Sequence, residues 1–539
     1  MERKPQSPEG ENRRSSIESI VGSLLSLAFV VVIGLPLIAR IAGFSTSEKT
    51  AEKRMLSPQP AVPRTLNALR QFPAAFELYW NDQFPSRAFF VRLHSWLNVF
   101  ALRTSPSSEI LLGRDQWLFY TGNDNLEELR GQLTWTESQL RTFARRLQER
   151  ERFVEELGGR YLLVFVPGKQ SVYASMLPRW ARKRAAETRL DQLCSYLEAN
   201  TDLDYINLSK PLAPSPGGEP TFFRTDTHWT EEGAMRAYQS MMRRIQDWYP
   251  GTRMFDAEEM NWSDPIPYSG DLAKMIMLES ELKDWRTPVT VEGEKNLTRR
   301  ELGTGHHDVI GRGVFREVDG ADPEAPSLFV FHDSYMGFQY GYMPMTFSQS
   351  WWKWQPNFDC RAIANRRPDI VLHEMAERFM IEGLAENPPE ISAEYAALKD
   401  AYDRSDAAIL ELSPSSGFDA VTVGQQAEIE SDVEGLAVHA SGRDPTLFLP
   451  KIELPVGSRP VVRISLTSPV ATTFRLYYWE KGNNQLFESS RYIGIGKNDI
   501  FLPLETIILN GRIRLDPGEI VGTYVLHRID VKLVEMPAE

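Results

Sequence analysis

The chain has 539 residues, which is too long for one hydrophobic core and predicts two or three domains. Its composition, 42% hydrophobic and 25% charged, is that of a globular protein. The formal net charge of −13 argues against non-specific nucleic-acid binding and against a polybasic membrane-surface role. We therefore expect no nucleic-acid partner.

Residues 19–39 contain no charged side chain. At about 1.5 Å per residue, a helix of this length crosses a hydrocarbon core of about 30 Å. The basic residues that precede it favour a cytoplasmic N-terminus; they are Arg3, Lys4, Arg13 and Arg14. A cleaved signal peptide is the alternative, but the apolar stretch is long for one and no clean A-x-A site follows it.

We therefore predict a single-pass inner-membrane protein whose later domains lie in the periplasm. It would have a cytoplasmic tail over 1–18 and a transmembrane anchor over 19–41. Residues 42–63 are polar and contain proline, which is typical of a linker. Residues 64–104 are amphipathic and aromatic, and they predict two helices.

Strand and helix patterns follow this segment. "GRDQWLFY" (113–120) predicts a turn into a short strand, and the charged periodic run 135–158 predicts a helix. From residue 160 apolar strands alternate with helices, which indicates a parallel, doubly wound α/β sheet. The expected strands are 161–169, 204–209, 327–334 and 368–375, and the expected helices are 185–200, 230–247 and 376–384.

Two further segments differ from this alternation. Residues 249–325 have turns and short segments, so we predict an insertion within an α/β domain that spans 64–412. Residues 413–539 are short β-rich runs separated by turns, which predicts an all-β sandwich resembling a carbohydrate-binding module.

Polar residues just past buried strands are candidates for a site, because ligands of open α/β sheets bind beyond the carboxyl ends of the strands. In "FFRTDTHWT", Asp226 and His228 stand two positions apart at what is expected to be a strand end. In "SLFVFHDSY", Ser334 follows a buried strand, where helix capping is the simpler explanation. A serine hydroxyl becomes a nucleophile when an imidazole takes its proton and a carboxylate orients that imidazole.

The Asp-x-His pair also permits a metal site or a merely polar strand end. A metal site needs further ligands at suitable spacing, and the sequence offers none. We therefore predict no metal, and we interpret the pair as the acid–base half of a serine-dependent site. The surroundings of Ser334 are not G-x-S-x-G, so the α/β-hydrolase elbow is absent.

Several segments resemble the alginate O-acetyltransferase-like branch of the SGNH/GDSL hydrolase superfamily, and the similarity covers roughly residues 64–385. They are "FPAAFELYWNDQFPSR", "GRDQWLFY", "VPGKQSVY", "TDTHWT", "SGDLAKM", "HDSY" and "PDIVLHEMAERF". The resemblance implies a circularly permuted SGNH domain with the Asp-x-His block before the serine block. It assigns the nucleophile to Ser334, the base to His228 and the orienting acid to Asp226.

The resemblance leaves the oxyanion donors open, because Glu377 stands about where the family's Asn block is expected. Tyr335, Arg378 or a backbone amide could take the place of that Asn as the oxyanion donor. We expect Asp333 to organise the backbone around the serine and Trp229 to pack the imidazole. Lys169 either reaches the site or pairs structurally with a carboxylate.

By the same resemblance, we expect an enzyme of exopolysaccharide biosynthesis that O-acetylates a polysaccharide through an acetyl-serine. It needs no cofactor, because a donor or a multi-spanning membrane acyltransferase partner delivers the acetyl group. A carbohydrate O-acetylesterase with the same triad is the first alternative. A non-catalytic glycan-binding scaffold of an exopolysaccharide machinery is the second.

Other residues carry open alternatives. Cys194 and Cys360 either pair in an oxidising compartment or are two buried thiols. His306 and His307 are interpreted as solvated loop residues, and His332 and His373 as either site-lining or strand-capping. The tryptophans of "SQSWWKWQ" form either a glycan-binding surface or part of a core; they are Trp351, Trp352 and Trp354.

Overall fold

The computed structural model describes the chain from residue 59 with gaps. The described ranges are 59–63, 65–83, 87–122, 124–182, 187–304, 314–452, 460–470, 472–480, 486–504 and 509–535, with Gly22, Ser23 and Ser26. The predicted anchor, apart from those three residues, and the loop with His306 and His307 lie outside these ranges. No helix within them is both long and apolar enough to cross a membrane.

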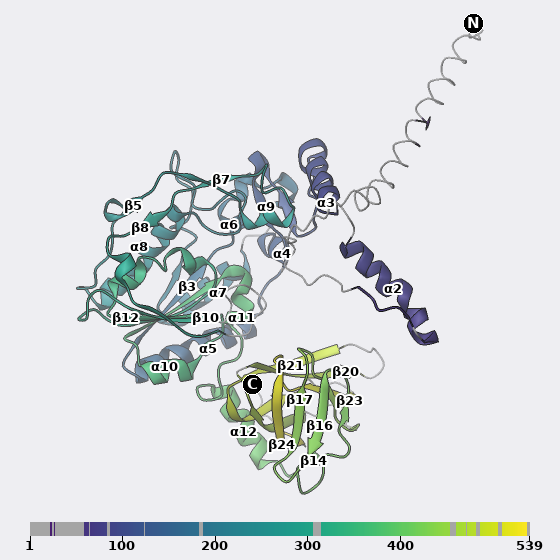
Figure 1. Ribbon diagram of the computed structural model, residues 1–539. Coiled ribbons are helices and arrows are strands. Elements are labelled where there is room, and N and C mark those ends of the chain that lie inside the picture. Colours follow the sequence, from purple (N-terminus) through teal and green to yellow (C-terminus); the bar gives the residue numbers. More distant parts are fainter. Residues whose placement is uncertain are drawn as a thin grey trace, which may run out of the picture.

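The larger part of the chain is built around a seven-stranded sheet (Figure 1). Its strand order is β4 (Tyr205–Asn207), β3 (Arg160–Val166), β13 (Ile370–Ala376), β11 (Leu328–His332), β12 (Gln349–Trp354), β10 (Val314–Asp319) and β9 (Arg299–Thr304). The first five strands run parallel, and β10 and β9 are antiparallel. The predicted parallel sheet is present, and it carries two antiparallel strands at one edge.

Helices cover both faces of this sheet (Figure 1). In β3, Leu162 and Val164 join the core on one face, and Tyr161 and Leu163 join the core on the other. The first face packs against α8 (Glu231–Trp248). The second face packs against α5 (Glu137–Glu156), α7 (Arg189–Asn200) and α10 (Cys360–Arg366). The central strands β3, β13 and β11 are mostly apolar because both of their faces are buried.

The predicted insertion, 249–325, is not separate from the sheet. Its last two strands, β9 and β10, complete the antiparallel edge beside β12. The remaining elements of the insertion are small, and α9 among them reaches the site described below. They are β5 (Asn261–Trp262), β6 (Ile266–Tyr268), α9 (Asp271–Met275), β7 (Asp284–Arg286) and β8 (Val289–Thr290).

The segment before β3 forms the two expected helices and a hairpin. The helices are α2 (Leu66–Gln83) and α3 (Arg87–Trp96), and a π-helical turn (Leu97–Leu102) continues α3. The hairpin pairs β1 (Ile110–Leu112) with β2 (Leu118–Tyr120), and α4 (Asn125–Leu129) follows. In Figure 1, α2 stands apart from the rest of the fold.

The C-terminal part forms two antiparallel sheets (Figure 1). One contains β14 (Ala408–Leu412), β16 (Ala427–Ser431), β17 (Leu436–Ala440), β19 (Pro460–Ser468), β22 (Gly496–Pro503) and β24 (Gly522–Leu533). The other contains β15 (Thr422–Val423), β18 (Leu447–Phe448), β20 (Thr472–Glu480), β21 (Leu486–Ile493) and β23 (Leu509–Asp516). Their inner faces share one hydrophobic core, as expected of a β-sandwich.

The predicted boundary at residue 413 is too late. Strand β14 pairs with β24 of the β-sandwich, and α12 (Ala393–Arg404) packs there as well. Tyr402 and Phe501 make an edge-to-face contact with ring centroids 5.0 Å apart. The β-sandwich unit therefore begins near residue 393, because the apolar side of α12 is buried against its strands.

One predicted helix is shorter than expected. Residues 376–384 form a 3₁₀ turn (Glu377–Phe379) and a single α turn, α11 (Met380–Gly383). The other short elements are α6 (Lys169–Val172) and the 3₁₀ turns 114–116, 174–176, 179–181, 257–259, 294–296, 335–338 and 343–346.

Candidate active site

Ser334 lies immediately beyond the carboxyl end of the central strand β11. It precedes a 3₁₀ turn (Tyr335–Phe338) and has a helical backbone conformation, with φ −69° and ψ −20°. Its side chain does not cap that turn. The helix-capping explanation is therefore wrong, and the half-buried hydroxyl of Ser334 is available for another partner.

The Asp-x-His segment is a loop and not a strand end. A single bridge between Phe222 and Trp229 closes it, and Phe223 N donates to His228 O at 3.2 Å. Thr230 then starts α8 by accepting a hydrogen bond from Gly233 N at 3.2 Å. The tight closure points Asp226 and His228 toward Ser334, which lies 106 residues further along the chain.

The three side chains form one hydrogen-bonded chain. His228 Nε2 lies 2.7 Å from Ser334 Oγ, and His228 Nδ1 lies 2.6 Å from Asp226 Oδ1. Because an ionised carboxylate only accepts, Nδ1 carries the proton and Nε2 is the acceptor that faces the serine hydroxyl. This is the arrangement that a general base needs in order to take the serine proton.

Asp226 is buried and saturated with donors. Its Oδ1 also accepts from His228 N at 2.9 Å, and its Oδ2 accepts from Tyr268 Oη at 2.7 Å and from Asp271 N at 2.8 Å. Burial alone would raise the pKa of the Asp226 carboxyl, but the hydrogen bonds and charge of His228 and the bond from Tyr268 hold that pKa well below its usual range. Asp226 is therefore a fixed negative charge that orients the imidazole.

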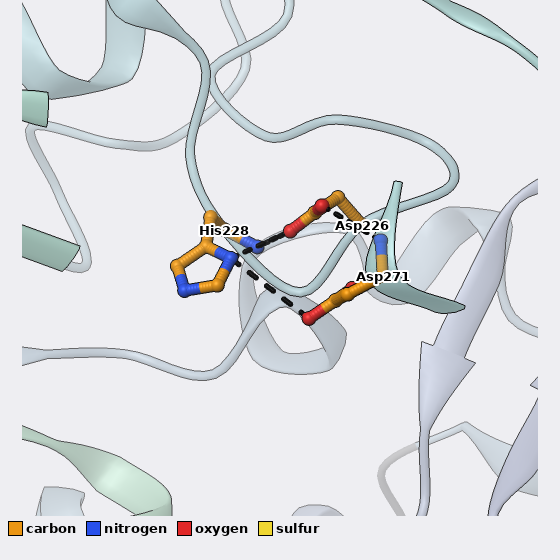
Figure 2. Close-up of side chains that lie close together, drawn as sticks. All are labelled: Asp226, His228 and Asp271. Carbon is orange, nitrogen blue, oxygen red and sulfur yellow. Dashed lines mark hydrogen bonds and ion pairs between the residues drawn. The ribbon is translucent and has the colours of Figure 1, made fainter. Parts of the chain in front are cut away.

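Asp271 is a second carboxylate beside the imidazole (Figure 2). Its Oδ2 lies 3.9 Å from His228 Nδ1 and accepts a hydrogen bond from Thr227 Oγ1 at 2.6 Å, and its Oδ1 accepts one from Thr227 N at 2.8 Å. Burial and the charge of Asp226 raise the pKa of Asp271. Asp271 therefore ties α9 of the insertion to the Asp-x-His loop.

Asp226, His228 and Asp271 also have the composition of a small metal-binding group, since ligand atoms of all three lie within 4.8 Å of one another. The donors described above already occupy these atoms: His228 Nδ1 faces Asp226, and Asp271 accepts from Thr227. The cluster therefore fits an orienting network better than a cation site.

A second buried carboxyl group lies behind Ser334. Asp333 Oδ1 accepts from Tyr335 N at 2.8 Å, and Asp333 N donates to Glu374 Oε2 of β13 at 2.9 Å. Burial and the charge of Asp333 raise the pKa of Glu374 well above its usual range. Asp333 thus organises the backbone around the serine, as predicted, through its bonds with Tyr335 and Glu374.

Lys169 lines the cavity beside Thr227 and Tyr335, as one of the two predicted roles requires. Its buried ammonium group donates to three backbone carbonyls: Leu118 O at 2.6 Å, Arg224 O at 2.9 Å and Asp226 O at 2.9 Å. Burial lowers the pKa of Lys169 to about 7. Lys169 therefore lines the cavity and supports the Asp-x-His loop, and its hydrogen bonds go to backbone carbonyls and not to a carboxylate.

Arg378 follows β13 and lines a small open cavity together with Tyr120, Asn125, Thr227 and Tyr335. Its guanidinium lies 5.5 Å from the centroid of the Tyr335 ring and 4.9 Å from that of Phe379. Within the described ranges, no side chain or carbonyl forms a hydrogen bond or ion pair with it. A half-buried guanidinium without an acceptor can bind an anion or a developing negative charge.

Tyr335 is not a free donor. Its hydroxyl donates to Thr227 O at 2.8 Å, and its amide donates to Asp333 Oδ1. By contrast, no acceptor among the described residues occupies the amide of Ser334. Of the predicted oxyanion donors, Arg378 and this backbone amide are therefore the two that remain available to bind an oxyanion.

The rings that flank the imidazole are Tyr335 and Phe338, with centroids 5.2 Å and 6.0 Å from that of His228. Trp229 is fully buried and packs on Tyr335 at 4.9 Å. Trp229 therefore supports the imidazole through Tyr335 and not by the direct contact that was predicted.

Other candidates are structural. Trp351 and Trp352 are buried in β12, so a glycan-binding surface is wrong for both, while Trp354 is half-buried beside His332. His332 Nδ1 lies 2.7 Å from Asp333 O, and burial lowers the pKa of His332 to about 4. His373 lies 3.0 Å from Tyr161 Oη, and burial lowers its pKa to about 3.

Cys194 and Cys360 are free, buried thiols, so the alternative of two unpaired cysteines is the correct one. Sequence reasoning did not assign a role to Tyr268, Asp271, Glu374 or Phe338. Asp271 lies within the quoted segment "SGDLAKM", and that resemblance is the signal that could have identified it.

Comparison with known proteins shows which family part of this chain resembles. Residues 110–305 match the family described as an SGNH hydrolase-like domain of the acetyltransferase AlgX. The predicted resemblance to the alginate O-acetyltransferase-like family of the AlgX and AlgJ type is thereby confirmed.

A relative from Pseudomonas syringae pv. tomato, named "Probable alginate O-acetylase AlgJ", is 25% identical over 253 residues, which is 47% of this chain. The match spans only 59% of that relative's own length. The solved O-acetyltransferase domain of Pseudomonas putida AlgJ is 18% identical, with a TM-score of 0.36, and covers 53% of this chain and 97% of its own. The solved structure of Pseudomonas aeruginosa AlgX is 13% identical, with a TM-score of 0.41, and covers 80% of this chain and 96% of its own.

Proposed function

We propose that the protein is a polysaccharide O-acetyltransferase that acts outside the cytoplasmic membrane through an acetyl-serine intermediate. The observation that carries the proposal is the hydrogen-bonded chain from Asp226 through His228 to Ser334. The matched family, described as an acetyltransferase domain, and a relative named as a probable alginate O-acetylase support the same chemistry.

In the first half-reaction, Ser334 Oγ attacks the carbonyl carbon of an acetyl donor while His228 Nε2 takes the hydroxyl proton. The bond between the acetyl carbon and the donor's leaving group breaks, and that group departs with the proton from His228. The imidazolium that forms between these steps is stabilised by Asp226, whose carboxylate is ionised at neutral pH.

In the second half-reaction, His228 Nε2 takes the proton of a sugar hydroxyl, whose oxygen attacks the acetyl-serine. The ester bond to Ser334 breaks, and the proton returns to Oγ. Both half-reactions pass through a tetrahedral oxyanion. We assign its donors to the Ser334 amide and the Arg378 guanidinium, because neither has an acceptor among the described residues.

The cellular setting is part of the proposal. With the predicted anchor at 19–41, the site would face the periplasm and act on an exopolysaccharide such as alginate, with no cofactor in this chain. A multi-spanning membrane partner would supply the acetyl group, and the β-sandwich would hold the glycan.

The test uses the full chain with p-nitrophenyl acetate, with and without uronate or neutral oligosaccharides. The proposal predicts p-nitrophenol release, acetylated oligosaccharide and loss of both in Ser334→Ala. Ser240→Ala is the matched control, because Ser240 Oγ bonds only Arg236 O of its own helix α8 among the described residues. This variant should retain both activities.

The outcomes separate the alternatives. Free acetate as the sole product at every oligosaccharide concentration would identify an esterase. An unreactive wild-type chain that also resists labelling by a fluorophosphonate would identify a non-catalytic scaffold. Either result would overturn the transferase proposal.

A further inference from the structure

Helices α2 and α3 each expose an apolar stripe. The α2 stripe consists of the exposed Leu69, Phe76 and Trp80 with the half-buried Phe72, and the α3 stripe consists of Phe89, Leu93 and Trp96. Phe76 is 43% exposed and Phe89 58% exposed. Along each helix these residues recur at spacings of three, four or seven, so each set lies on one face.

The exposure of the α3 stripe is not a sign that the helix is detached. Next to the stripe on the same segment, Ser95 and Val99 are buried, and Val99 packs with Leu272 and Ile276 at α9. Arg92 Nη2 also donates to Glu281 Oε1 at 2.6 Å. The side of α3 next to the stripe is therefore fixed to the α/β domain, while Phe89, Leu93 and Trp96 stay exposed.

The aromatic rings of the α2 stripe pack against one another. The rings of Phe72 and Phe76 stack with centroids 5.7 Å apart, and those of Phe76 and Trp80 stack at 6.1 Å. Monomeric soluble proteins seldom expose contiguous apolar surface of this kind, and such patches mark protein or membrane contacts. The stripes therefore need an occupant.

We propose that the α2 and α3 stripes bind the surface of a lipid bilayer. Helices with tryptophan, phenylalanine and leucine on one face are typical of segments that lie at the bilayer interface. The predicted anchor ends at residue 41, and the chain from there to residue 59 reaches at most about 60 Å when extended. The stripes are thus held within reach of the membrane in which that anchor would lie.

The charge of the chain favours this mode of binding over an electrostatic one. The formal net charge is −13, so anionic headgroups do not attract the chain as a whole. Burial of the aromatic and leucine side chains supplies the affinity instead, and zwitterionic lipid suffices for it.

The test measures the depth of each stripe in the full chain, reconstituted in phosphatidylcholine vesicles with brominated acyl chains. Single cysteines at Phe76→Cys and Phe89→Cys carry an environment-sensitive fluorophore. The native thiols, Cys194 and Cys360, are buried with pKa values raised to about 12, so labelling at the introduced thiols is selective. Leu78→Cys, on the opposite face of α2, and Val433→Cys, in the β-sandwich, are the matched controls.

The proposal predicts blue-shifted emission with several-fold quenching by the brominated lipid at Phe76→Cys and Phe89→Cys, and aqueous emission without quenching at both controls. Aqueous emission at the stripe positions would overturn it. Blue-shifted emission without quenching would overturn it as well, because a protein partner or a second copy would then cover the stripes.

Discussion

At the scale of single residues, the site depends on where protons and charges are held. The Asp226 carboxylate receives four hydrogen bonds, two of them from His228, and so it stays ionised. Burial and the charge of Asp333 instead raise the pKa of Glu374, one strand away on β13, well above its usual range. The pKa values of two buried acids near one serine are thus shifted in opposite directions, because Asp226 accepts four hydrogen bonds and Glu374 accepts one, from Asp333 N.

We predict that Arg378→Gln lowers kcat by about 10²-fold with little change in KM, since an oxyanion donor acts in the transition state. Steady-state kinetics with p-nitrophenyl acetate measure this split. Arg361→Gln, at an exposed ion pair with Glu390, is the control and should leave both constants unchanged. A rise in KM alone would instead assign Arg378 to substrate binding.

Glu374→Gln should change how stability depends on pH. The pKa of Glu374 is raised in the folded state, so the folded chain binds the proton more tightly than the unfolded chain does. Wild-type stability therefore falls as pH rises above the unfolded pKa of about 4.3, and the Gln variant lacks this loss. Denaturant unfolding at pH 5 and pH 8 tests this, with surface Glu428→Gln as control. An equal pH dependence in wild type and Glu374→Gln would contradict it.

The sequence indicated Asp226, His228 and Ser334 because short motifs carry them. It did not indicate Tyr268 or Glu374. Tyr268 bonds Asp226, 42 residues before it, and Glu374 bonds Asp333, 41 residues before it. No periodicity or motif spacing reports such pairs. The first forms only when the insertion folds onto the Asp-x-His loop, and the second only when β11 lies beside β13.

At the scale of elements, the close approach of two loops positions Asp226. A Cβ atom on Gly270 would lie 2.1 Å from Thr225 O and 2.6 Å from Asp226 N. Only glycine therefore allows the start of α9 to reach the Asp-x-His loop and lets Asp271 N donate to Asp226.

Gly270→Ala should push α9 away from that loop and remove two of the bonds that orient Asp226 and Thr227. We expect kcat to fall by at least about tenfold, because losing a hydrogen bond to a charged group costs about 1.5–3 kcal/mol. Gly251→Ala, where an added Cβ meets nothing within 4 Å, is the control and should be neutral. Full activity in Gly270→Ala would contradict the assigned role of α9.

The elements that could be predicted were those with a long apolar run or a clear helical period. The buried strands β3, β11 and β13 are continuous apolar runs, and α5 and α8 have a clear helical period. Strands β9 and β10 were missed because "RRELGT" and "VFREVD" are charged, as is usual at a sheet edge that faces solvent.

At the scale of the whole molecule, the chain divides into an α/β part and a β-sandwich with separate cores. The sequence placed their boundary at 413, because α12 has the same helical pattern as the helices of the α/β part. Only packing shows that Tyr395, Leu398 and Tyr402 are buried against the β-sandwich.

A fragment of residues 393–539 should therefore melt cooperatively, whereas 413–539 should be less stable. The shorter fragment lacks α12 and β14, and it exposes Val461 and Phe501. We expect its Tm to be lower by at least about 10 °C, given about 1.5–3 kcal/mol for each large apolar side chain no longer buried. Thermal melts followed by circular dichroism compare the two fragments. Equal Tm values would show that the β-sandwich unit begins at residue 413 and not near residue 393.

The most direct test of the central claim is the mass of the intact full chain after brief incubation with p-nitrophenyl acetate, followed by peptide mapping. The account predicts a single added acetyl group on Ser334, absent in Ser334→Ala and strongly reduced in His228→Ala. An acetyl group on another residue, or one that persists in Ser334→Ala, would contradict the assignment of Ser334 as the nucleophile.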